Sequence, residues 1–193
     1  MKGIIFTVLN EIVEEKFGLA AWQQLLDATG DDGIFTGSGT YEDQRLFALT
    51  GALSAQSGLP VDALLRTYGE YAIPKFYETY PVFFDRVGTL REFLLSIDGI
   101  IHVEVRKLYP KVRLPKIWYD DSDANSLIVN YQSDRKLCVL AEGMILGAAT
   151  YFSEPVELAQ SKCQNCGDDH CAIDVTFQSL TKAQPTPQVL ETC

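Results

Sequence analysis

Apolar residues recur every three or four positions through most of the first 108 residues, which is the spacing that predicts amphipathic helices. The turn-rich stretch 31–41 predicts a loop between two helical groups. A first-turn proline, Pro60, predicts the start of a further helix. The other predicted helices cover residues 2 to about 30 with a break near Phe17-Gly18, then 41–57, and then 87–108.

The pattern changes in the second half, where short apolar runs lie between turn residues. These runs predict strands at 116–120, 127–130, 156–159 and 172–177, with an apolar helix at 137–152. Helices crowd one half and strands the other, which is typical of an α+β fold. We predict a single domain over residues 1–180, with a helical N-terminal half packed on a C-terminal four-stranded antiparallel sheet, and a disordered tail at 181–193.

Charge and cysteine content narrow the class of protein. The net charge of −10 argues against nucleic-acid binding, which relies on basic residues. No stretch approaches the roughly 20 apolar residues of a membrane span. Acidic residues at helical spacing interrupt the apolar N-terminus, which is not the pattern of a signal peptide. The five cysteines are an odd count, and three crowd into one segment, which favours a reducing cytoplasm over a secreted disulfide framework.

A run of alternating polar groups follows the second predicted strand. Residues at i, i+2 and i+4 of an extended segment point to one side, so Tyr131, Ser133 and Arg135 would present two hydroxyls and a guanidinium together. Arginine binds carboxylates with two parallel hydrogen bonds, and the hydroxyls can fill the remaining acceptor sites. The array suits a ligand with paired carboxylates, such as a haem with its two propionates. The alternative is a strand end with solvated polar side chains.

His102 lies in the strongly apolar stretch Ile100–Val105 and is one of two histidines. It is either a core histidine satisfied by a hydrogen bond or an axial ligand for haem iron, which accepts imidazole. One planar cofactor would explain both this histidine and the array of Tyr131, Ser133 and Arg135. The aromatic-rich stretch 68–84 has the same two interpretations, as core packing or as a wall for a flat apolar ligand.

The Tyr-x-Ser-x-Arg motif resembles that of the H-NOX family, the haem–nitric oxide/oxygen-binding domains. The resemblance extends to the Met-Lys-Gly-Ile-Ile start, the position of His102, the run 107–110, Pro115, and the Leu-Cys-x-x-Ala-Glu-Gly stretch at 137–143. It implies that haem b lies between the two halves and that His102 is the proximal ligand. It also implies that Tyr131, Ser133 and Arg135 bind the propionates and that Pro115 presses against the haem.

The resemblance also bears on which gas is bound. Oxygen-binding members carry a tyrosine donor where this chain has Leu140, and the other positions that resemble the distal wall are apolar: Ile5, Leu9, Ala72 and Phe76. Bound O₂ needs a donor whereas NO does not, so we expect a sensor that binds NO and CO and excludes O₂. The family's mechanism implies that His102 is released from iron on NO binding. With no catalytic motif apparent, we expect a non-enzyme that controls a separate sensor histidine kinase or cyclic-di-GMP enzyme.

Cysteines with Cys-x₂-Cys spacing, Cys163 and Cys166, are followed by Cys171. That spacing is typical of a tetrahedral zinc site. The resemblance supplies Cys138 as a further ligand, since a subset of H-NOX proteins has a zinc site there; His170 is the alternative fourth ligand. Reduced thiols, or disulfides formed on oxidation, are the other interpretation, and redox sensing is a secondary role.

Two other functions compete with the NO sensor. One is a haem-free, zinc-stabilised module that binds a small molecule, like the related 4-vinyl-reductase-type domains. The other is a haem enzyme such as a peroxidase, which needs distal acid–base groups that the sequence does not offer.

Overall fold

The computed structural model describes residues 1–178, so the predicted disordered tail at 181–193 and Cys193 lie outside the described residues. The main helices are α1 (Gly3–Phe17), α2 (Leu19–Thr29), α3 (Asp43–Ser57), α4 (Val61–Thr79), α5 (Leu90–Ser96), α6 (His102–Leu108) and α7 (Cys138–Phe152). Single turns form η1 (Pro81–Phe83), η2 (Ile97–Ile101) and η3 (Gln164–Cys166). The strands are β1 (Lys116–Asp120), β2 (Ser126–Gln132), β3 (Val156–Lys162) and β4 (Cys171–Phe177).

The first four helices lie where the periodicity predicts them. Gly18 separates α1 from α2 with a φ of 89°, a conformation that favours glycine. Pro60 caps the N-terminus of α4, which continues through Pro74 to Thr79. The predicted break near Phe17-Gly18 and the opening proline are therefore both confirmed.

The predicted long helix at 87–108 is divided into three pieces. It begins only at Leu90, because the Thr89 side chain caps α5 by accepting a hydrogen bond from the Glu92 amide. The turn η2 is then a π-turn, in which the amide of His102 donates to the carbonyl of Ile97 five residues back. Because periodicity alone does not mark one extra residue in a helix, the sequence did not predict this interruption.

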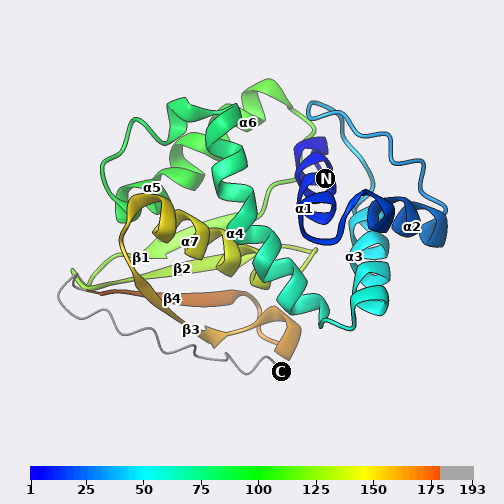
Figure 1. The fold of residues 1–193 in the computed structure, drawn as a ribbon. Coiled ribbons are helices and arrows are strands. Elements are labelled where there is room, and N and C mark those ends of the chain that lie inside the picture. The colour runs from blue at the N-terminus through cyan, green and yellow to red at the C-terminus, as the bar shows by residue number, and fades with distance from the viewer. Residues whose placement is uncertain (179–193) are drawn as a thin grey trace.

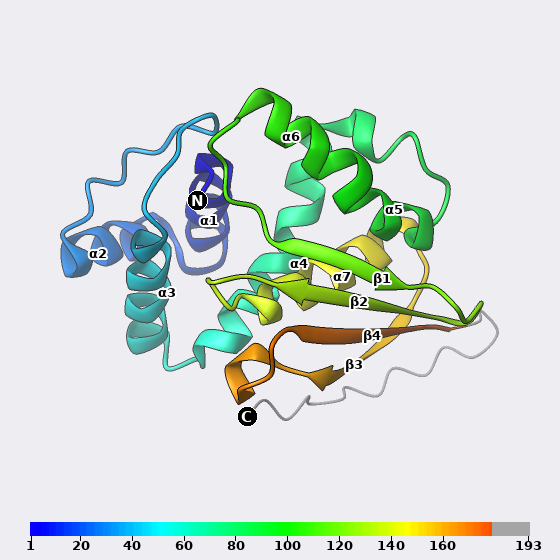
Figure 2. The same cartoon turned by 180° about the vertical axis from the view of Figure 1, so that it is seen from behind.

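The four strands form one antiparallel sheet in the order β1-β2-β4-β3, as predicted for the C-terminal half. β1 has the predicted bounds, whereas β2, β3 and β4 are longer than predicted by one to three residues at an end. Helices α4 and α7 cover one face of the sheet, with α1 to α3 to one side and α5 and α6 beyond the β1 edge (Figures 1 and 2).

Helices α4 and α7 touch backbone to backbone at three glycines. A Cβ on Gly143 would lie 2.1 Å from the Arg66 carbonyl oxygen, and one on Gly69 would lie 2.5 Å from the Leu140 carbonyl oxygen. A Cβ on Gly147 would lie 2.7 Å from the Glu70 carbonyl oxygen. Only glycine permits this approach, so α4 and α7 form a fixed layer over the sheet.

Two groups of buried apolar residues fill the interior. One joins α1 to α4 with the start of α7, and the other joins α5 and the rest of α7 with the sheet. None of the helices within residues 1–178 has both the length and the apolar character that crossing a bilayer requires.

Candidate functional site

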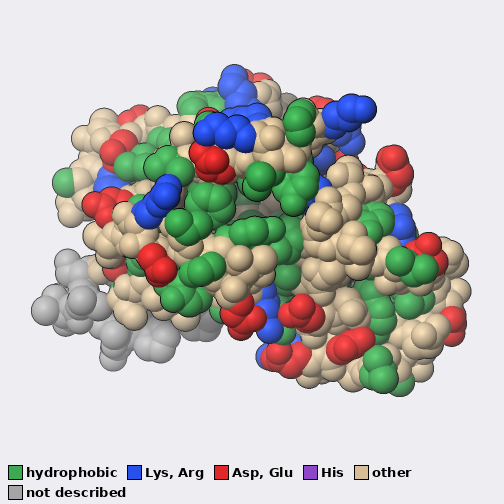
Figure 3. Space-filling model, turned by 90° about the horizontal axis from the view of Figure 1, so that it is seen from above, with side chains coloured by type: hydrophobic (Ala, Val, Ile, Leu, Met, Phe, Trp, Pro, Cys, Tyr) green, Lys and Arg blue, Asp and Glu red, His purple; other side chains and the backbone are tan. Residues whose placement is uncertain are grey.

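A cavity of about 750 Å³ lies where the two groups of buried residues meet. Its walls come from α1, α4, the α5–α6 segment, the β1–β2 pair and α7, and most of the lining side chains are apolar. Seen from above, the molecule is hollowed on this side, with apolar side chains around the hollow (Figure 3). The volume is in the range that holds a cofactor-sized ligand.

His102 is the histidine that lines this cavity in the described part of the chain. It is the first residue of α6, and its side chain is only 12% exposed. Its Nδ1 lies 3.4 Å from Oδ1 of Asp98, one turn earlier. Burial lowers the pKa of His102 despite this carboxylate, so the imidazole is held in the neutral form that binds metals.

Only two of the three residues predicted to bind the propionates line the cavity. Tyr131 and Arg135 line the cavity, whereas Ser133 is not among the lining residues. β2 ends at Gln132, so Arg135 reaches the cavity through a turn and not through strand alternation as predicted. Ser133 shapes that turn, since its Oγ accepts a hydrogen bond from the Arg135 amide at 3.2 Å.

Asp43, at the start of α3, holds Arg135 from the side. Its carboxylate lies 2.9 Å from Nε of Arg135, without the alignment of a hydrogen bond. It also accepts hydrogen bonds at 2.8 Å from the Met1 amino group and from Arg113. Burial would raise the pKa of Asp43, but the Met1 amine and Arg135 together lower it. The sequence did not indicate this cluster because its members are remote along the chain.

Four of the six residues predicted to contact the haem faces line the cavity. Ile5, Phe76, Leu140 and Pro115 line the cavity. Leu9 and Ala72 do not; they are buried among the packed residues of α1 and α4.

Two further tyrosines, Tyr80 and Tyr109, line the cavity and were not predicted as site residues. Tyr80 follows α4 and Tyr109 follows α6. Tyr109 belongs to the family-like run 107–110, which could have indicated it. The cavity lining thus includes two tyrosines as well as the apolar Leu140.

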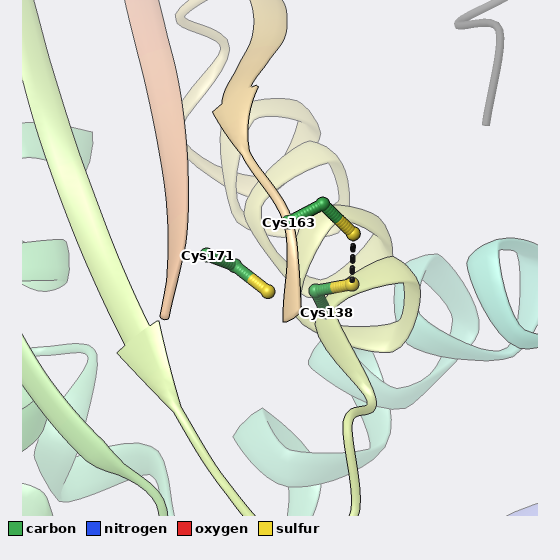
Figure 4. A group of neighbouring side chains, drawn as sticks. All are labelled: Cys138, Cys163 and Cys171. Atoms are coloured by element: carbon green, nitrogen blue, oxygen red, sulfur yellow. Dashed lines mark hydrogen bonds between the residues drawn. The ribbon is translucent and has the colours of Figure 1, made fainter. Parts of the chain in front are cut away.

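Three predicted metal ligands lie together at the N-terminus of α7. The sulfurs of Cys138, Cys163 and Cys171 lie within 4.8 Å of one another, and those of Cys138 and Cys163 are 3.9 Å apart (Figure 4). Zn–S bonds of 2.3 Å in a tetrahedron place sulfurs about 3.8 Å apart, so this spacing suits zinc. Burial raises the pKa of Cys138, and that of Cys171 to about 12, when no metal is bound.

The other two candidate ligands are not members of this group of three. Cys166 ends η3, on the loop between β3 and β4, and its sulfur is in a disulfide, so it is not the thiolate ligand that was predicted. His170 stacks on Trp118 at 5.0 Å between ring centroids, and its Nδ1 lies 2.7 Å from Asp169.

Amide groups donate to two of the three thiols. The backbone N–H of Gln164 donates to the Cys171 sulfur at 3.2 Å, and the Asn165 side chain donates to Cys138 at 3.5 Å. Such donors stabilise thiolates and orient metal ligands.

The sequence matches related proteins over most of its length. The model of the haem-NO-binding family matches residues 2–160. The curated relatives include soluble guanylate cyclases 89Db and 89Da of Drosophila melanogaster, which are 26% and 27% identical over 143 residues. These matches cover 70% of this chain but 20% of each cyclase, so the chain spans about a fifth of their length.

Solved structures match the fold closely. An H-NOX protein from S. oneidensis in the Fe(II)NO ligation state is 28% identical, with a TM-score of 0.88 over 93% of this chain and 100% of that chain. The unliganded Fe(II) H-NOX protein from K. algicida is 31% identical, with a TM-score of 0.85 over 95% and 100%. The H-NOX protein from Shewanella woodyi, solved with IWP-051 in the Fe(II)CO state, is 32% identical, with a TM-score of 0.82 over 97% and 100%. The chain belongs to the haem-NO-binding (H-NOX) family.

Proposed function

We propose that this chain is a haem-based nitric oxide sensor that binds haem b in the 750 Å³ cavity. The observation that carries the proposal is the placement of a buried, neutral imidazole and a guanidinium on the walls of one apolar cavity. An apolar cavity suits the porphyrin face, the imidazole suits iron, and the guanidinium suits propionate. The haem iron supplies the gas-binding centre.

The residues around the cavity have separate roles in this proposal. His102 binds the iron through Nε2, while Arg135 and the Tyr131 hydroxyl bind the propionates. Ser133 supports them by holding the turn that carries Arg135. Pro115, the residue just before β1, would contact the porphyrin.

Selectivity follows from the absence of a donor at Leu140. NO binds ferrous iron without a hydrogen bond, whereas O₂ needs one, so the protein binds NO and CO and excludes O₂. His102 would hold the haem iron, and its release on NO binding would free the α5–α6 segment to move. We propose that this change is read by a separate sensor histidine kinase or cyclic-di-GMP enzyme in the cytoplasm, and that the chain has no catalytic activity of its own.

Absorption spectra of the purified ferrous protein under argon, air, CO and NO test the proposal. We expect a Soret band that is identical under argon and air and that shifts with CO and with NO. A shift under air would contradict O₂ exclusion, and the Tyr80→Phe and Tyr109→Phe variants would then identify the donor. The absence of haem even after reconstitution would refute the sensor and favour a haem-free small-molecule module.

We further propose that Cys138, Cys163 and Cys171 bind zinc. Cys166, the predicted further ligand, is in a disulfide in this structure and would join them only after reduction of that disulfide. The supporting observations are the sulfur spacing and the amide donors around the thiols. Elemental analysis should give about one zinc per chain in the wild type and a strong loss in Cys171→Ser. Full zinc retention in Cys166→Ser would exclude Cys166 and direct the search to His170, tested as His170→Ala.

A further inference from the structure

The π-turn η2 determines which side of α6 faces the cavity. Each residue of an α-helix turns about 100° around the axis, so in an unbroken helix His102 would lie about 80° away from Leu94, eight residues earlier. The extra residue of the π-turn removes about one such step and brings His102 to within about 20° of Leu94. Leu94 and His102 accordingly both line the cavity.

The same turn carries the acidic partner of His102. Asp98 is its second residue, and its Oδ1 lies 3.4 Å from Nδ1 of His102. The same oxygen lies 3.8 Å from Arg106, one turn further along α6. Asp98, His102 and Arg106 therefore follow one another at intervals of four residues, with a single carboxylate oxygen between the imidazole and the guanidinium.

Gly99 does not account for this geometry through close packing. A Cβ on Gly99 would meet no atom within 4 Å, and Gly99 is exposed. Gly99 is also not among the residues that line the cavity.

We propose that Asp98 is a positioning residue that sets how strongly His102 binds the haem iron. By accepting a hydrogen bond from Nδ1, the carboxylate fixes the tautomer whose free nitrogen is Nε2 and makes that nitrogen a stronger donor to metal. Arg106 draws on the same oxygen and weakens this effect. The inference rests on the proposed function, since it takes His102 as the iron ligand.

The two partners should act in opposite directions. Removing the carboxylate weakens the iron–imidazole bond and favours release of His102 on NO binding. Removing Arg106 leaves the carboxylate to His102 alone and strengthens the bond. The second effect is smaller, because Arg106 is 48% exposed and 3.8 Å from the shared oxygen.

Resonance Raman measurement of the iron–histidine stretching frequency in the ferrous protein tests the inference. We expect Asp98→Asn and Asp98→Ala to lower the frequency and to accelerate loss of His102 after NO addition on the order of 10-fold. Asp98→Glu should restore part of the frequency, and Arg106→Ala should raise it. The matched control is Lys107→Ala, since Lys107 is on the same helix, is 64% exposed and pairs with Glu104; its frequency should be that of the wild type.

Nitrogen-15 NMR of the haem-free protein provides a second readout. We expect the wild type to populate mainly the His102 tautomer protonated at Nδ1, and Asp98→Asn to lose that preference. Failure of the wild type to bind haem would refute the proposed function, and the tautomer measurement would still test Asp98. Haem binding with an unchanged frequency in both Asp98→Asn and Asp98→Ala would overturn the inference alone.

Discussion

Asp43 shows how much of the site depends on a residue outside the recognised motif. Its carboxylate contacts the Met1 amine, Arg113 and Arg135, which come from three separate segments. Its own side chain and those of Met1 and Arg135 are at most 12% exposed. Removing the carboxylate would therefore leave buried cations without an anionic partner.

Asp43→Asn should destabilise the protein by roughly 3 kcal/mol near neutral pH. The folded-state pKa of Asp43 is below its unfolded value, so the unfolded chain takes up the proton first as pH falls. The stabilisation is thus fully present above about pH 5 and is lost as pH falls through about 4 and towards the folded pKa. Urea unfolding of both proteins across this range measures the difference.

Asp32→Asn is the control for this prediction. Asp32 is 61% exposed and pairs with Arg45, so its loss should cost less than about 1 kcal/mol. Equal effects of the two substitutions would contradict a special role for Asp43.

Leu140→Tyr should introduce affinity for O₂. A hydroxyl hydrogen bond to a charged ligand contributes about 1.5–3 kcal/mol, which corresponds to roughly a 10- to 100-fold gain in affinity. The spectrum of the ferrous variant in air measures it, with Leu140→Phe as the control of similar size without the hydroxyl. Identical spectra for Tyr, Phe and the wild type would mean that position 140 does not face the bound gas.

At the scale of elements, the sequence predicted the features that turn residues and apolar periodicity determine locally. The break at Gly18, the cap position of Pro60 and all four strands follow from turn residues and periodicity. The π-turn at Ile97–Ile101 did not, since one extra residue leaves an apolar helix apolar. The segment that carries Arg135 was predicted to be extended because polar alternation continues past Gln132, but it forms a turn where pairing with β1 ends.

The backbone contact between α4 and α7 gives a stability prediction. Gly143→Ala places a Cβ 2.1 Å from the Arg66 carbonyl oxygen, and this overpacking should cost about 1–3 kcal/mol or more. Gly51→Ala, in α3 with no atom within 4 Å of its Cβ, should instead stabilise by roughly 0.5–1 kcal/mol. Denaturant unfolding compares them; equal signs would mean that α4 and α7 can separate without cost.

At the scale of the whole molecule, the site lies between parts that the sequence could not place relative to one another. His102, Tyr131 and Arg135 were predicted from residue type and resemblance, and they share one cavity. Leu9 and Ala72 were expected at the same wall but are packed in the core, because resemblance of position does not determine which side chain reaches the cavity. Asp43 was missed because only the packing of distant segments reveals it. Tyr80 and Tyr109 lie in the stretches 68–84 and 107–110 that the sequence singled out, but neither was named as a site residue.

Haem binding should stabilise the folded state as a whole. Free haem at 100 times its dissociation constant would add about 2.7 kcal/mol. Arg135→Ala should reduce this gain by weakening haem retention, as measured by the melting temperature with and without haem and by transfer of haem to apomyoglobin. Lys111→Ala, with a charge removed outside the cavity lining, is the control. An undiminished gain in Arg135→Ala would mean that the propionates are bound elsewhere.

The glycine contacts between α4 and α7 also bear on how the molecule can deform. Two helices whose backbones already touch cannot slide or part without losing their packing, whereas α5, η2 and α6 are short pieces joined in series. The cavity thus has one stiff wall and one compliant wall, and displacement will be absorbed on the compliant side. A partner protein that responds to ligand binding in the cavity would therefore respond best by binding the surface of α5 and α6.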